Sequence, residues 1–166
     1  SLHGGIRGNP RQLDRRANYG DNFFVPEDDE YIIVSPIKLG VDWSSRKISD
    51  LILDVSSNLK IDENRIYLTG LSLGGRGTFI VASELSDTFA AIMPFSPHHT
   101  PYSYKEKSMK VSHLPIYLHH SKNDRVSSFT IAEDTYNNIK AVNDNIIFNI
   151  IITKKIINIF IVKFYF

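Results

Sequence analysis

The pattern of apolar and polar positions predicts alternating strands and helices over most of the chain. Short apolar or β-branched runs predict strands at residues 31–34, 65–69, 90–93 and 115–119. Apolar residues at helical spacing predict helices at residues 48–59, with Ser44 or Ser45 as N-cap, and at residues 74–85 and 128–142. Strands separated by helices of this length pair in parallel through right-handed crossovers. The pattern therefore predicts an α/β fold, a mostly parallel sheet with helices on both faces.

The composition changes sharply near Val142. Residues 143–166 consist almost entirely of Ile, Asn, Lys, Phe, Val and Tyr. Lysines interrupt this stretch before it reaches the roughly 18 residues that a membrane helix needs. An aberrant end to the chain is the preferred interpretation, and one or two buried strands or a poor membrane segment are the alternatives. The predicted organisation is a partial domain at residues 1–142 followed by this tail.

Charge and cysteine content exclude some function classes. The formal net charge of +1 gives no indication of electrostatic capture of nucleic acid or of an acidic membrane. The chain has no cysteine, which excludes disulfides, thiolate metal sites and cysteine nucleophiles but does not fix the compartment. No signal peptide is visible at the start, and the first residues resemble the middle of a domain.

The candidate chemistry centres on Ser72 in the motif Gly70-Leu71-Ser72-Leu73-Gly74. The motif follows an apolar run predicted as a strand and opens a predicted helix rich in small residues. A strand, a sharp turn and a helix are what a nucleophile elbow requires. Side chains at Gly70 and Gly74 would clash where strand and helix approach each other. The alternative is a glycine-rich turn with an incidental serine. In the elbow, Ser72 is the nucleophile and the backbone N–H of Leu73 is an oxyanion donor.

The segment Leu2-His3-Gly4-Gly5 fits a loop that leaves an early strand and gives the second oxyanion N–H. Gly5 is the predicted donor, and Gly4 lets the backbone come close. His3 is expected to brace this loop by hydrogen bonds rather than to act as a base. Taken alone, the segment would be interpreted as a flexible terminus, and the motif at Ser72 favours the oxyanion interpretation.

An acidic residue, Asp124, follows the predicted strand at residues 115–119. The chain order of serine and then aspartate fits the α/β-hydrolase triad, in which the carboxylate orients the base. A solvated loop aspartate is the alternative. His98 and His99 follow the strand after Ser72 and are expected near the rim of the site, where they would line the cleft.

A metal site is not expected. Adjacent histidines on a strand point to opposite faces, and no carboxylate has helical spacing to them. The predicted chemistry needs no cofactor.

These stretches together resemble the α/β-hydrolase superfamily, in its compact esterase and predicted-peptidase group. That group includes feruloyl-esterase-like and phospholipase/carboxylesterase-like enzymes. The resemblance covers residues 2–142 and rests on four stretches: residues 2–5, 62–75, 89–92 and 114–126. Its most specific part is the Asp-x-x-Arg-Ile-Tyr run at residues 62–67 leading into the elbow. The register implied by the resemblance places the triad acid at Asp124, and a one-residue slip would place Asn123 there.

The same resemblance implies a histidine on a loop after the final strand and further strands before His3. The sequence contains no histidine after His120, and the chain is expected to be truncated at both ends. The expected function is hydrolysis of carboxylic esters through an acyl-enzyme, weak or inactive here because the triad histidine is missing. The alternatives are a serine peptidase acting on short peptides and a non-catalytic remnant. The expected partner is a small ester or short peptide.

Overall fold

The computed structural model describes residues 1–4, 31–38, 41–100 and 103–152. Its elements in chain order are α2 (Ser45–Asn58), η3 (Glu63–Arg65), β1 (Tyr67–Leu71), α3 (Leu73–Glu84), β2 (Ala91–Phe95), α4 (Lys105–Ser108), η4 (Met109–Val111), β3 (Ile116–Ser121), α5 (Phe129–Lys140) and β4 (Ile146–Ile151).

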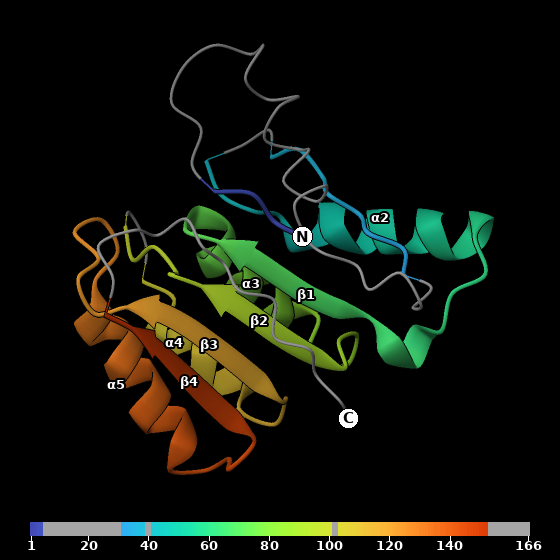
Figure 1. Ribbon diagram of the computed structural model, residues 1–166. Coiled ribbons are helices and arrows are strands. Elements are labelled where there is room, and N and C mark those ends of the chain that lie inside the picture. The colour runs from blue at the N-terminus through green and yellow to red at the C-terminus, as the bar shows by residue number, and fades with distance from the viewer. Residues whose placement is uncertain (5–30, 39–40, 101–102, 153–166) are drawn as a thin grey trace.

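The four named strands form one parallel sheet in the order β1-β2-β3-β4. Leu68 pairs with Ile92, Ile92 with Ile116, and Ile116 with Ile146, so a row of apolar side chains crosses the sheet. All four strands run in one direction, and their carboxyl ends gather at the left of Figure 1. The predicted α/β-hydrolase fold class, with its mostly parallel sheet, is confirmed.

Local sequence explains where the helices begin. Ser44 caps α2, its hydroxyl accepting from the N–H of Lys47, and Ser128 caps α5 by accepting from the N–H of Ile131. Both are side-chain acceptors for N–H groups that have no partner inside the helix. The strands predicted at residues 65–69 and 90–93 begin two residues and one residue later than predicted, and both end two residues later, because strand bounds depend on pairing partners distant in the sequence.

The described helices gather on one face of the sheet. Helix α3 packs on β1 and β2, α5 packs on β3 and β4, α4 lies between α3 and α5, and α2 packs against α3 (Figure 1). The core between them includes Leu68, Phe79, Ile92, Leu118 and Ile139. On the opposite face, Tyr67 and Ile147 are about half exposed. Within the described residues, the predicted helical cover is therefore present on one face.

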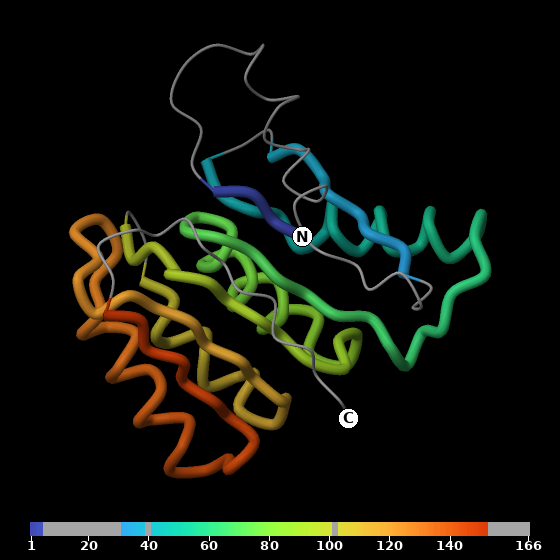
Figure 2. The backbone as a smooth tube through the Cα atoms, viewed as in Figure 1, coloured from blue at the N-terminus to red at the C-terminus, as the bar shows by residue number. Residues whose placement is uncertain are grey.

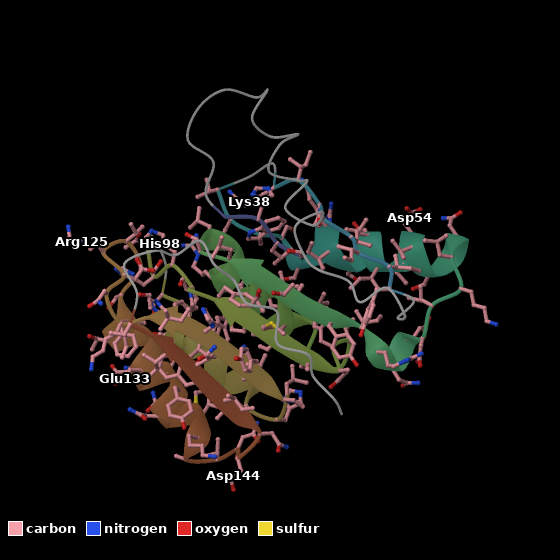
Figure 3. The ribbon with its side chains drawn as sticks, in the orientation of Figure 1. Lys38, Asp54, His98, Arg125, Glu133 and Asp144 are labelled. Atoms are coloured by element: carbon pink, nitrogen blue, oxygen red, sulfur yellow. The ribbon has the colours of Figure 1, made fainter. Side chains whose placement is uncertain are left out.

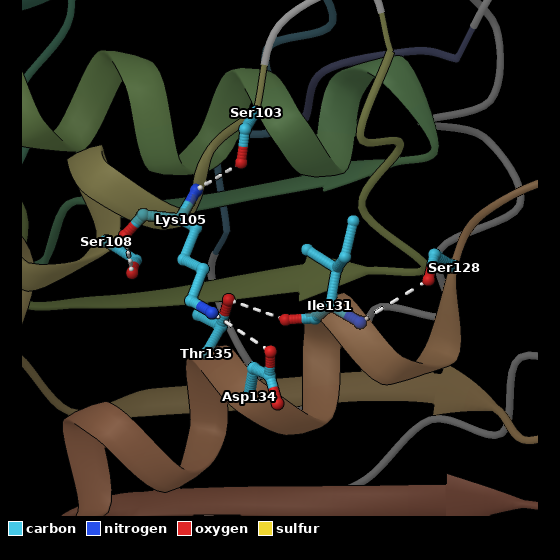
Figure 4. A network of polar contacts seen from close by, with 7 residues as sticks. All are labelled: Ser103, Lys105, Ser108, Ser128, Ile131, Asp134 and Thr135. Atoms are coloured by element: carbon cyan, nitrogen blue, oxygen red, sulfur yellow. Dashed lines mark hydrogen bonds and ion pairs between the residues drawn. The ribbon is translucent and has the colours of Figure 1, made fainter.

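Helices α4 and α5 are joined by an exposed ion pair between Lys105 Nζ and Asp134 Oδ2, 2.9 Å apart (Figure 4). Inside α5, the Thr135 hydroxyl donates to the Ile131 carbonyl at 2.7 Å.

The predicted strand at residues 31–34 is wrong. These residues form no strand, and Tyr31, Ile32 and Ile33 are 41–57% exposed. Their apolar run is not enclosed by other described residues, so it lacks the packing that a strand needs. The segment lies beside the first residues of the chain (Figure 2), where the amino group of Ser1 donates to the Val34 carbonyl. Leu2 makes a single parallel bridge with Gly70 of β1.

The tail begins as a strand. Residues 146–151 are β4 and pair with β3 along its whole length. Their sequence, IIFNII, suits a strand because β-branched residues pack well on a pleated surface. The alternative interpretation, of a strand, matches residues 146–151. Residues 153–166 lie outside the described residues, and the division at Val142 stays a prediction.

Candidate active site

Ser72 lies between β1 and α3 in a backbone conformation that L-residues rarely adopt, with φ 58° and ψ −114°. Its N–H donates to the Phe95 carbonyl at 2.9 Å. Its own carbonyl accepts from the N–H groups of Arg76 and His98, both at 3.0 Å. Strained backbone of this kind persists only where surrounding contacts hold it in place. The side chain stays partly exposed at the carboxyl end of the sheet.

The two glycines of the motif are there because backbone segments meet. A Cβ at Gly74 would lie 2.6 Å from the carbonyl carbon of Leu2 and 2.7 Å from the carbonyl oxygen of His3. A Cβ at Gly70 would lie 2.9 Å from Leu2 Cβ and closer still to the backbone of Gly74. The strand and the helix therefore approach as closely as the sequence pattern predicts.

The segment predicted to carry an oxyanion donor lies against Ser72. A Cβ at Gly4 would lie 3.2 Å from the Leu71 carbonyl oxygen and 3.4 Å from Ser72 Cβ, so Gly4 is in contact with the elbow. Leu73 is the first residue of α3, where backbone N–H groups have no partner within the helix. Gly5, the other predicted donor, lies outside the described residues.

His3 braces this segment. It is 4% exposed, its Nδ1 lies 2.7 Å from the carbonyl oxygen of Gly4, and its Nε2 accepts from the N–H of Lys38 at 3.0 Å. An imidazole that accepts at Nε2 carries its proton on Nδ1, so Nδ1 donates to Gly4. The ring also packs edge-on against Trp43 with centroids 4.9 Å apart.

Asp124 lies in the loop after β3 and closes a turn. Its N–H donates to the Ser121 carbonyl at 3.1 Å. Its Oδ1 accepts from the N–H groups of Val126 and Ser127 at 2.8 and 3.0 Å. One carboxylate oxygen therefore holds the loop that leads to α5. Neighbouring Asn123 points elsewhere, its amide donating to the Ile152 carbonyl at 3.1 Å.

His98 lies between Ser72 and the loop that carries Asp124, at the same end of the sheet as Arg125 (Figure 3). Its N–H binds Ser72, its Nδ1 lies 3.5 Å from Ser127 Oγ, and its Nε2 lies 2.7 Å from Thr100 Oγ1. Burial lowers the pKa of His98, His99 and Arg76 lower it further, and Asp124 opposes them. These two contacts of the His98 ring nitrogens are with Ser127 and Thr100 rather than with Ser72.

His99 contacts the start of α5, which follows the loop that carries Asp124. Its Nδ1 accepts from the N–H of Ser128, the N-cap of α5, at 3.3 Å. The His98 and His99 rings meet edge-on at 5.4 Å. The structure thus brings both histidines to the end of the sheet where Ser72 and Asp124 lie.

Strand β4 ends beside the loop that carries Asp124. The N–H of Lys122 donates to the Ile151 carbonyl at 2.8 Å, which keeps the end of β4 against the acid loop.

His119 and His120 are buried on β3 and point away from each other. His119 contacts Asn149 on β4 at 3.1 Å, and His120 packs near Phe129 of α5 with ring centroids 5.9 Å apart. Burial lowers the pKa of both. Within the described part of the chain, no group of three or more His, Asp or Glu side chains is placed to hold a metal ion.

Arg76, which the sequence reasoning passed over, is fully buried in the first turns of α3. Its Nη2 lies 2.8 Å from Asp42 Oδ2, and its Nη1 donates to the Thr100 carbonyl. The sequence held one signal for this residue: a charged side chain two positions after Gly74, among the small residues that begin a helix predicted to pack on the sheet. A buried arginine needs a charged or polar partner, so this position indicates an ion pair.

The described helices include none that is long and apolar enough to cross a membrane.

A parallel sheet, a strained serine between strand and helix and a glycine segment packed against it define an α/β-hydrolase. The model of the phospholipase/carboxylesterase family matches residues 34–154, and the chain belongs to this family. A search of curated proteins finds no match.

Solved structures agree with the fold. A thermostable esterase is 25% identical with a TM-score of 0.58, over 64% of this chain and 27% of that one. The fluorophosphonate-binding serine hydrolase F of Staphylococcus aureus is 14% identical with a TM-score of 0.63, over 90% and 72% of the two chains. Arabidopsis thaliana SOBER1 is 15% identical with a TM-score of 0.58, over 90% and 85%. The chain thus spans about a quarter of the thermostable esterase and most of the other two.

Proposed function

We propose that this protein hydrolyses carboxylic esters through an acyl-enzyme on Ser72. The single observation that supports this most is the backbone of Ser72, held at φ 58° by hydrogen bonds to Phe95, Arg76 and His98. A serine keeps such a strained backbone conformation where its hydroxyl must project from the turn between strand and helix. The nearby Gly4 backbone supports an oxyanion site on the other side of the hydroxyl.

In the proposed reaction, Ser72 Oγ forms a bond to the ester carbonyl carbon and its proton passes to a base. The negative charge on the carbonyl oxygen is held by the N–H groups of Leu73 and Gly5. The alcohol leaves with a proton, and water then releases the acid and restores the serine. In a complete triad the base is a histidine whose cationic form Asp124 stabilises; this chain has no histidine after Asp124, and the proton passes to solvent water instead. Since no histidine follows His120, we expect turnover far slower than in an enzyme with a complete triad.

Acyl transfer to Ser72 is tested by mass spectrometry of the chain after exposure to an activated acyl ester. We expect one added acyl group, located by digestion to the peptide that contains Ser72 and absent from Ser72→Ala. Ser86→Ala, a change at another serine near the end of α3, serves as the matched control. Acylation at another residue, or of Ser72→Ala at the same rate, would overturn the proposal.

The bond that is cleaved is decided by a paired assay. A carboxylic ester and the amide of the same acyl group are compared under identical conditions. The proposal predicts release of acid from the ester only, and faster release from the amide would favour a peptidase.

A further inference from the structure

The two edges of the described sheet differ. At β1, Leu2 forms a bridge with Gly70 and its N–H donates to the Thr69 carbonyl at 2.8 Å, so the first residues of the chain lie along that edge. At the other edge, β4 pairs with β3 and, within the described residues, with no other strand. An exposed strand edge offers a row of backbone donors and acceptors to a further strand.

The ladder between β3 and β4 shows which backbone groups of β4 face this edge. The Asn145 carbonyl accepts from the N–H of Ile116, at the start of β3, at 3.1 Å. The Ile151 carbonyl accepts from the N–H of the residue that follows β3, at 2.8 Å. Because strand backbone alternates with a period of two, the odd-numbered residues of β4 bind β3. The N–H and C=O groups of the even-numbered residues, Phe148 and Ile150 among them, therefore point to the edge.

The sequence of β4 lacks the features by which natural edge strands avoid pairing. Such strands carry charged side chains, proline or a bulge. The six residues of β4, IIFNII, contain no charge and no proline, and they pair with β3 in unbroken register. Ile147 is 56% exposed and Ile150 is 43% exposed, on opposite faces of the strand. The edge thus combines outward backbone groups with exposed apolar side chains.

We propose that β4 is the interface of a homodimer, in which the β4 strands of two copies pair antiparallel about a two-fold axis at Asn149. The charges that flank the strand are complementary in this direction. Asp144, whose side chain is 94% exposed, precedes β4, and Lys154 follows it in the sequence. Antiparallel pairing centred on Asn149 sets Asp144 of one copy against Lys154 of the other, whereas parallel pairing sets like charges side by side. The ion pair of Asp144 with Lys140 is exposed to solvent and competes weakly.

The same register satisfies the backbone. It places Phe148 of one copy opposite Ile150 of the other, and both residues direct their N–H and C=O groups to the edge. Hydrogen-bonded and non-hydrogen-bonded pairs alternate along antiparallel strands, so the two Asn149 residues form a non-hydrogen-bonded pair on the axis. A contact of this kind uses the same surface of both copies and closes at two. Ser72 lies beyond β1, at the opposite edge of the described sheet, so the inference does not depend on its reactivity.

A cysteine placed on the axis tests the register. The chain contains no cysteine, so a single introduced thiol can link only two copies. Asn149→Cys places two thiols in a non-hydrogen-bonded pair with Cα atoms about 4.5 Å apart, within the range that a disulfide spans. We expect a covalent dimer when the full chain is mildly oxidised.

Ile147→Cys is the matched control. Ile147 is more exposed than Asn149, so its thiol is the more accessible of the two. In the proposed register, however, the two copies of residue 147 lie roughly 13 Å apart along the strands, beyond the disulfide limit of about 7 Å. We therefore expect Ile147→Cys to stay uncoupled under the conditions that couple Asn149→Cys. Equal coupling of the two variants would overturn the proposed register.

Sedimentation of the unmodified full chain over a series of concentrations measures the oligomeric state directly. We expect twice the mass of one chain. Ile150→Pro removes an N–H that faces the edge and leaves the ladder with β3 in place, so we expect a folded monomer. If Ile150→Pro does not fold, the two cysteine variants decide.

A monomeric wild-type chain would overturn the proposal, and the edge would then be covered by residues 153–166 of the same chain or by solvent. A folded Ile150→Pro chain that sediments as the wild type does would also overturn it, because the contact would then lie elsewhere. Acylation of Ser72 is measured apart from these experiments, so the two proposals fail independently.

Discussion

The proposed nucleophile, Ser72, and the proposed acid, Asp124, are held in different ways. At Ser72 the backbone does the positioning: two glycines let β1, α3 and residues 2–4 meet at atomic contact. At Asp124 a side chain does it, one carboxylate oxygen accepting from two N–H groups of an otherwise exposed loop. Contacts between buried backbone segments leave no room for substitution, whereas a cap on an exposed loop tolerates an isosteric replacement. We therefore expect substitutions in the backbone contacts around Ser72 to destabilise the fold, and an isosteric substitution at Asp124 to be tolerated.

Gly74→Ala tests most strongly whether the backbone contacts around Ser72 exclude a larger residue. The added Cβ would meet the backbone of Leu2 and His3, which cannot move as a flexible side chain can. We expect a loss of at least about 3 kcal/mol in the free energy of unfolding, within the range of severe core substitutions. Urea denaturation measures it, with Ser83→Ala on the same helix as control. A loss under about 1 kcal/mol would show that the elbow is looser than described.

His3→Phe tests how far the brace at residue 3 supports the nucleophile end. Phenylalanine keeps the packing against Trp43 and removes the hydrogen bonds to Gly4 and Lys38. We expect a loss of roughly 1–3 kcal/mol in unfolding free energy, the cost of leaving buried polar groups without partners. Acylation of Ser72 is expected to slow as well. Unchanged stability together with an unchanged rate of acylation would show that the His3 hydrogen bonds do not support Ser72.

Two substitutions at Asp124 separate its structural role from its chemical one. Asp124→Ala removes the acceptor for Val126 and Ser127, and we expect it to cost roughly 1–2 kcal/mol of stability, as a lost cap does. Asp124→Asn keeps an oxygen in that place and should cost about 0.5 kcal/mol or less. If Asp124 serves the proposed reaction, both variants lower the acylation rate of Ser72 about equally. An Asn variant acylated at the wild-type rate would make Asp124 a structural cap.

A smaller effect is expected from pH. Burial lowers the pKa of His119 and His120, so the folded chain binds fewer protons than the unfolded chain below the ordinary histidine pKa of 6.5. Their contribution to stability is therefore complete above pH 6.5 and is lost as pH falls toward their lowered values. Between pH 7.5 and 5.5 we expect a decline of roughly 1–2 kcal/mol. His120→Phe should reduce that slope, and a stability that rises on acidification would contradict the argument.

The same contrast decides how much of the molecule could be predicted from sequence. The elbow could be predicted from the spacing of Gly70, Ser72 and Gly74. Two backbone segments approach closely only where glycines leave room for them, and both glycines lie within five positions. The helices at Ser44 and Ser128 were predictable from apolar spacing and N-caps. These features depend on short-range sequence.

The errors and omissions depend on distant partners. The run at residues 31–34 has strand-like residues but lies exposed, and residues 146–151 form β4 because β3 lies beside them. Arg76 pairs with Asp42 and Thr100, each more than twenty residues away, so its sequence neighbours indicate a buried charge but not the partners of that charge. No sequence pattern could show that the carbonyl and hydroxyl of Thr100 serve two different partners.

The central claim is that Ser72 is an activated nucleophile. Covalent labelling with a fluorophosphonate probe tests this claim most directly. The full, folded chain is compared with Ser72→Ala, which leaves every backbone contact of the elbow in place. We predict slow labelling of a single site that disappears in Ser72→Ala. Labelling that persists in Ser72→Ala, or a folded wild-type chain that takes up no probe, would contradict the central claim.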